Sequence, residues 1–198
     1  MWSLLPTDYR FIEAGSGYIY FDSLIDKNSF EIAVIASYAR APLCGSRLKL
    51  YRFKKPVVFF GKARISEQYV YFERISTINT RLKNYLYLNY NKSRNPRRSS
   101  KIITDEYIEK IVFSFQQAHP NVSSKGYLCP GTLGRFDQSW PPSIAANYLV
   151  RLVSMLSVPN YDSTMEEYGC KSYRKLRKYL EPELESCLKQ KCRRFYKR

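Results

Sequence analysis

The sequence is poor in histidine and has no glycine-rich phosphate loop, and each absence excludes a class of enzyme. The 198 residues include one histidine, His119, so a metal site or catalytic centre built on two histidines is excluded. No Gly-Lys-Ser/Thr occurs, and the glycines do not have P-loop or dinucleotide-loop spacing. A nucleotide-driven enzyme is therefore not expected. By spacing alone, His119 and Cys129 could still form a nucleophile–base pair.

Long apolar runs are missing as well. The longest, Ile32 to Ala36, has the length of a strand and falls far short of the roughly 18 residues that cross a membrane. The first residues lack a basic stretch and soon reach Asp8, so we expect no secretory signal. We therefore expect an intracellular, reducing compartment (cytoplasm, nucleus or organelle matrix) and no membrane partner.

The five cysteines show no metal-binding spacing. Structural zinc sites use ligand pairs two to four residues apart, and the closest pair here is Cys187 and Cys192 on an expected helix. Five residues of helix turn the chain by about 500°, which places these two side chains about 140° apart. We expect no metal and no cofactor, and in a reducing compartment the cysteines are expected to be thiols.

Acidic residues are scarce in two stretches of the chain. Segment 47–101 holds two, Glu67 and Glu73, among fifteen lysines and arginines, and segment 171–198 holds three among eleven. The rest of the chain is slightly acidic, although the net charge is +16. A block of one sign repels itself and destabilises the fold unless a polyanion compensates it. The commonest such polyanion is nucleic acid.

The first half of the chain has the pattern of β-structure. Short runs rich in aromatic and β-branched residues recur about every ten residues, bounded by Gly, Pro or Asp. They predict strands at residues 17–22, 30–38, 48–53, 57–60 and 69–75. Proline separates the third from the fourth.

The second half is helical in pattern. Expected helices run from Thr104 to Pro120, from Ser143 to Pro159, from Ser163 to Leu180 and onward from Pro182. The sequence thus predicts an α+β fold: an antiparallel sheet of about five strands packed by three to four helices. Region 1–101 would be β-rich and basic and region 102–198 helical, within one compact domain.

A carboxylate pair gives one catalytic alternative. Asp22 and Glu31 could face each other across a hairpin, and clustered carboxylates are what a metal-dependent nuclease needs to hold its cations. A small nuclease is therefore an alternative hypothesis. The other is an adaptor that binds an acidic protein.

The first basic block mixes cations with aromatic residues, which is the composition of a surface that pairs with phosphates and stacks bases. Tyr51, Phe53, Phe59 and Phe60 stand among its cations, although strands also bury such residues in cores. The predicted contacts of this block, in the strands and in the basic loop that follows, are Arg47, Lys49, Arg52, Lys54, Lys55, Lys62, Arg64, Lys92, Arg94, Arg97, Arg98 and Lys101.

The second basic block lies on an amphipathic helix and a terminal tail. Three- and four-residue spacing places several cations on one side of the helix, opposite Tyr173, Leu176 and Leu180. The predicted contacts of this block are Lys171, Arg174, Lys175, Lys178, Arg193 and Arg194.

These patterns predict a non-enzymatic nucleic-acid-binding protein, a structural or accessory subunit of a nucleoprotein assembly. No base-reading motif is present, so phosphate contacts are expected to outweigh sequence recognition. The aromatic residues slightly favour RNA over DNA. Other subunits of the assembly are the remaining expected partners.

Overall fold

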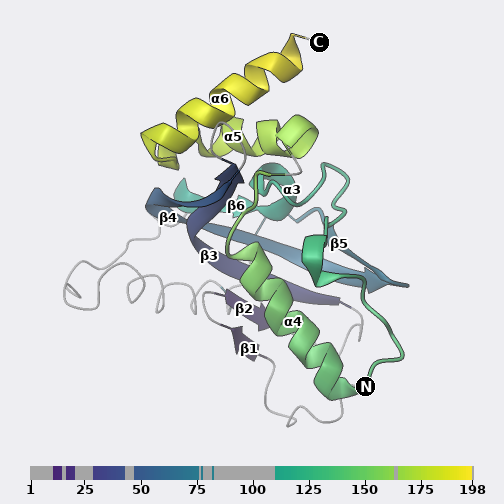
Figure 1. Ribbon diagram of the computed structural model, residues 1–198. Coiled ribbons are helices and arrows are strands. Elements are labelled where there is room, and N and C mark those ends of the chain that lie inside the picture. The colour runs from purple at the N-terminus through teal and green to yellow at the C-terminus, as the bar shows by residue number, and fades with distance from the viewer. Residues whose placement is uncertain are drawn as a thin grey trace, which may run out of the picture.

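The fold is built on one sheet. The computed structural model describes residues 11–14, 17–20, 29–42, 47–75, 77, 82, 110–162 and 165–197. Five strands follow one another antiparallel in chain order, and a sixth pairs parallel with the fourth. They are β1 (Phe11–Ala14), β2 (Gly17–Tyr20), β3 (Ser29–Pro42), β4 (Leu48–Ser66), β5 (Tyr69–Glu73) and β6 (Val112–Ser114). The sheet comes mainly from the first half and the helices from the second, which confirms the α+β class (Figure 1).

The longest strand replaces two expected ones. β4 runs unbroken through Pro56, where the sequence predicted a gap between strands 48–53 and 57–60. The pairing with β3 shifts there, because Ala36 lies opposite Val57 but Tyr38 lies opposite Arg52. Proline has no N–H to donate to a ladder and is tolerated at such a bulge. The bulge in the β3–β4 pairing therefore accommodates Pro56, and β4 continues past it.

The core lies where β3 and β4 cross the middle of the sheet. Residues 32–36 of β3 and 57–60 of β4 are buried on consecutive positions, so both faces of the sheet are covered there. The helix α4 (Pro142–Leu156) packs against β1, β2 and β3. Its Val153 lies so close to Gly17 that a Cβ there would be 2.4 Å from the valine methyl.

The helix expected from Thr104 to Pro120 is wrong over its second half. Val112–Ser114 forms β6, parallel to Val58–Phe60 of β4, and a single helical turn, α3 (Phe115–Ala118), follows. An apolar run such as Ile111–Phe113 fits a helix stripe and a buried strand equally well. Tertiary pairing with the free edge of β4 decides between them. Residues 104–109 lie outside the described residues.

The remaining helices match their expected positions. α4 begins at Pro142, one residue before the expected start. A π-helical turn, Met165–Gly169, leads into α5 (Cys170–Leu176), and a 3-10 turn follows before Leu180 pairs with Phe53 of β4. α6 spans Pro182–Tyr196, with proline in its first turn as expected.

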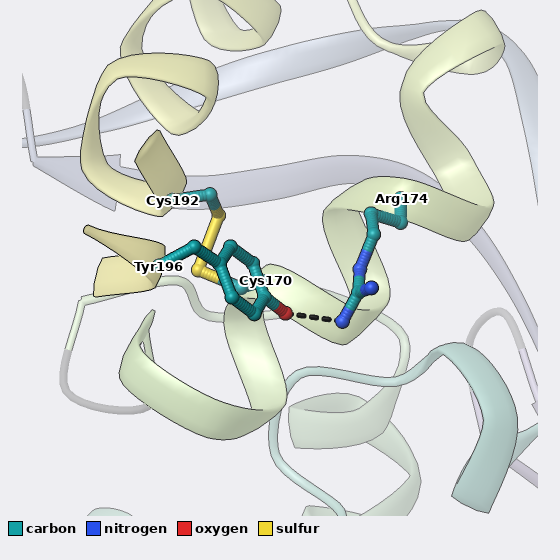
Figure 2. The surroundings of a disulfide bond; sticks show 4 residues. All are labelled: Cys170, Arg174, Cys192 and Tyr196. Atoms are coloured by element: carbon teal, nitrogen blue, oxygen red, sulfur yellow. Dashed lines mark hydrogen bonds between the residues drawn. A yellow bond between two sulfur atoms is a disulfide. The ribbon is translucent and has the colours of Figure 1, made fainter. Parts of the chain in front are cut away.

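A disulfide joins Cys170 of α5 to Cys192 of α6, with their Cα atoms 5.3 Å apart (Figure 2). Both residues are buried, at 0% and 4% exposure. The expectation that all five cysteines are thiols is therefore wrong. Cys187 and Cys192 are the closest pair along the chain, and spacing along the chain does not indicate a bond to Cys170. The fold instead brings together two cysteines that are 22 residues apart. Cys129 and Cys187 take no part in this disulfide, and the Cys187 thiol donates a hydrogen bond to the carbonyl oxygen of Pro42 at 3.4 Å.

Replacing Cys170 and Cys192 together with alanine is expected to lower the free energy of unfolding by about 3 kcal/mol. Cross-linking a loop of this length removes about that much conformational entropy from the unfolded chain. Urea unfolding followed by circular dichroism measures it. A reductant should destabilise the wild type and leave the double variant unchanged. Equal stability of the two proteins under oxidising conditions would contradict the disulfide's role.

Gly126 is expected to be the glycine least tolerant of substitution. Its φ is +91°, and an added Cβ would lie 2.1 Å from the carbonyl oxygen of Phe72. Gly126→Ala should therefore cost upwards of about 2 kcal/mol of unfolding free energy, from backbone strain and a clash together. Gly131→Ala is the matched control, because φ is +53° there but no atom lies within 4 Å. If urea unfolding shows that Gly126→Ala and Gly131→Ala lose the same unfolding free energy, the clash with Phe72 is refuted.

Candidate nucleic-acid interface

Three predicted contacts on the sheet are already paired with two acids of the protein. Lys49 on β4 forms an ion pair of 2.9 Å with Glu183 of α6, and the hydrogen bond to that carboxylate raises the pKa of Lys49. Lys62 and Arg64 both contact Glu73 on β5, at 3.4 Å and 2.9 Å. An anion would have to compete with these carboxylates. We therefore do not place the candidate interface here.

The aromatic residues of the first basic block belong to the core. Tyr51, Phe53, Phe59 and Phe60 are all buried, so none of them can stack on a base. Arg52 and Lys54 alternate with Tyr51 and Phe53 along β4 and are exposed on the opposite side. Arg47 and Lys55 are exposed too. This region therefore has exposed cations that could contact a phosphate, but its four aromatic rings are not available to stack on a base.

Some of the residues predicted for a site lie outside the described residues. They are Asp22 of the nuclease pair and the loop cations Lys92, Arg94, Arg97, Arg98 and Lys101. Of the nuclease pair, Glu31 is described. It lies on β3 directly opposite Lys62, which lies in turn opposite Glu73 of β5. Within the described ranges, no three His, Cys, Asp or Glu side chains are grouped so that they could hold a metal.

His119 is buried in the core and held by the backbone at both ring nitrogens. Nε2 donates to the carbonyl oxygen of Leu156 at 3.0 Å, and Nδ1 accepts from the N–H of Asn121 at 3.2 Å, which fits the neutral Nε2–H tautomer. Burial lowers the pKa of His119 to about 3. With both nitrogens occupied, the ring has no site left for a proton from Cys129. The sequence-based pairing is therefore not supported.

Lys171 points into the protein. Its ammonium donates to the carbonyl oxygens of Gln116 and, at 3.5 Å, Val122, which ties α5 to the segment that follows β6. Burial is the main cause of its lowered pKa. The ammonium therefore serves internal carbonyls, although the helical pattern placed it among the phosphate contacts.

A pocket of about 540 Å³ lies between α5 and α6, and Cys192 of the disulfide is among the residues that line it. Figure 2 shows the disulfide with Arg174 and Tyr196 beside it. Residues at three- and four-residue spacing along one face of α6 form one wall, and α5 supplies the other. The lining residues are Tyr173, Arg174, Lys189, Cys192, Arg193, Tyr196 and Lys197. Four of the seven are cations, and none is acidic.

The guanidinium of Arg174 is held in place by Tyr196. It donates a hydrogen bond to the tyrosine hydroxyl and lies 4.8 Å from the centre of the ring (Figure 2). Among the described residues, neither Arg174, Lys189, Arg193 nor Lys197 forms an ion pair with an acid. Four cationic residues therefore border this pocket without an acidic partner among the described residues, in contrast to the sheet cations beside Glu73.

The sequence predicted part of this pocket. Arg174 and Arg193 were among the expected contacts, whereas Lys189, Lys197 and Tyr196 were not. The spacing Lys189–Arg193–Lys197 is a detectable signal, because these residues share one helix face. Which face meets α5 depends on the disulfide, which the sequence did not reveal. The other predicted helix cations, Lys175, Lys178 and Arg194, are exposed outside the pocket.

Comparison with protein-family models, curated proteins and solved structures finds no match to this chain. Among the residues described, no helix is both long and apolar enough to cross a membrane.

His119 should make the protein sensitive to mild acid. Its folded-state pKa, about 3, lies below the ordinary value of 6.5, so the unfolded chain binds the proton more readily. The contribution of the neutral His119 ring to the free energy of unfolding is complete above pH 6.5 and is lost progressively as the pH falls toward 3. The excess stability of wild type over His119→Gln should therefore shrink across this range in urea unfolding. A difference independent of pH would contradict the buried neutral ring.

Proposed function

We propose that this protein is a non-enzymatic nucleic-acid-binding protein, a structural or accessory subunit of a nucleoprotein assembly. The observation that carries the proposal is the α5–α6 pocket, which is lined by Arg174, Lys189, Arg193 and Lys197 and by no acid. Like charges gathered in one place repel one another unless an anion compensates them. Phosphates of a nucleic-acid strand supply that compensation and accept the hydrogen bonds of lysine and arginine.

The distribution of neutralised and open cations supports this site over the sheet. Glu73 and Glu183 already satisfy three of the seven sheet cations, whereas the pocket cations have no such partner among the described residues. Exposed Arg52 and Lys54 on β4, and Lys175 and Lys178 after the pocket wall, would extend the contact to neighbouring phosphates. Contacts of this kind position a strand without reading its sequence.

The preferred partner is single-stranded nucleic acid. Tyr196 lies beside the pocket cations and is 54% exposed, so an unpaired base can stack on its ring. The slight preference for RNA came from aromatic residues of the sheet, and four of those are buried. RNA and DNA single strands are therefore both proposed partners, with other subunits of the assembly alongside.

An intracellular location remains part of the proposal. Disulfides are rare in reducing compartments, so the Cys170–Cys192 bond argues against an easily reduced environment unless it is protected. Protection is available, because both cysteines are almost fully buried between the two helices.

Binding should weaken steeply with salt. For a short fluorescent single strand, fluorescence anisotropy should give a plot of log affinity against log salt with a slope of about −0.7 per phosphate contacted. Replacing Lys189 and Arg193 together with glutamine removes two contacts, so the slope should become shallower by about one to two. An absence of binding to RNA and DNA even at low salt would refute the proposed function.

A further inference from the structure

The pocket holds more positive charge than an internal phosphate can balance. Four cations line it, and one phosphodiester of a continuous strand carries a single negative charge. A phosphomonoester at a strand end carries about −1.5 to −2 at neutral pH and offers three acceptor oxygens. The charge of the site is therefore better matched by a terminal phosphate than by a phosphate within a chain.

The pocket has the size of a ligand site and is not merely a groove for one oxygen. Its volume of about 540 Å³ falls within the roughly 300–1,000 Å³ typical of small-molecule pockets, and the hollow is open to solvent, so it has room for a phosphate group that is attached to a longer strand. Cys192, joined to Cys170, contributes to the lining, so the link between the two helices lies at the site itself (Figure 2).

The guanidinium of Arg174 is also ordered before a ligand arrives. The hydrogen bond and ring contact with Tyr196 fix the planar guanidinium of Arg174, and a fixed guanidinium can grip two phosphate oxygens at once. The disulfide fixes the distance between α5, which carries Arg174, and α6, which carries Lys189 and Arg193. Preorganisation of this kind lowers the entropic cost of binding.

We propose that the α5–α6 pocket binds a phosphomonoester group, supplied by the phosphorylated end of a nucleic-acid strand. The proposal depends on the proposed function for the source of the phosphate. A free nucleotide carries the same chemistry and is the alternative source.

The test compares short single strands of one sequence that differ only at their ends: 5′-phosphate, 3′-phosphate and unphosphorylated. A nucleoside monophosphate and inorganic phosphate, titrated alone by calorimetry, complete the set. A phosphorylated end should raise affinity at least about tenfold, because it adds charge-assisted hydrogen bonds. The pocket variant Lys189→Gln/Arg193→Gln should remove that preference.

A closely matched control is available on the same helix. Lys191→Gln/Arg194→Gln removes the same two charges, one lysine and one arginine, from outside the pocket lining. It should lower affinity for all three strands alike and keep the preference for a phosphorylated end. Circular dichroism of both variants checks that they fold.

Each outcome separates this inference from the proposed function. Equal affinity for phosphorylated and unphosphorylated strands would overturn the inference and leave nucleic-acid binding standing. A preference that survives the pocket variant, or that the control also loses, would overturn it as well. If no strand binds but a nucleoside monophosphate binds through Lys189 and Arg193, the pocket is a phosphate site and the proposed function is wrong. If nothing binds, both are wrong.

Discussion

Pairing between β3 and β4 is the interaction on which the rest of the fold depends. The two strands pair from Ser29–Arg64 to Pro42–Leu48, and β4 offers its other edge to β5, β6 and Leu180 in turn. β5, β6 and the segment that ends at Leu180 are thus each positioned by a part of β4. The last of these contacts, between Phe53 and Leu180, fixes the end of the segment that carries α5 and brings α6 after it. The candidate site is therefore placed by the sheet, although no sheet residue lines it.

The sequence predicted the fold class because its two halves differ so clearly in hydrophobic period. It failed where a local pattern has two readings. Pro56 indicates a break, but a bulge lets β4 continue past it. Val112 and Phe113 fit a helix stripe, yet they pair with Val58 and Phe59 because that edge of β4 is open to them. In each case the secondary structure is set by pairing with a strand that is distant in sequence. A local hydrophobic pattern carries no information about such a contact.

The candidate site was predictable in composition but not in geometry. Counting charges indicates the C-terminal helices, but helix faces alone do not tell which of their cations line the pocket. Lys171 donates to internal carbonyls, and Lys189 and Lys197 line a pocket that periodicity alone did not indicate. The missing information was the relative placement of α5 and α6, fixed by the disulfide between Cys170 and Cys192. The charge pattern thus indicates a polyanionic partner as a hypothesis, and packing decides which cations lie together in the fold.

In the function proposed here, a nucleic-acid strand occupies the pocket between α5 and α6. Ultraviolet crosslinking of the native protein with the nucleic acid that co-purifies with it tests this most directly, followed by mass spectrometry of the nucleotide-bearing peptides. The account predicts crosslinks on peptides that contain Tyr196 or the neighbouring pocket residues of α5 and α6. Crosslinks confined to other parts of the chain, or a preparation free of nucleic acid that also acquires no crosslinks when strands are added, would contradict it.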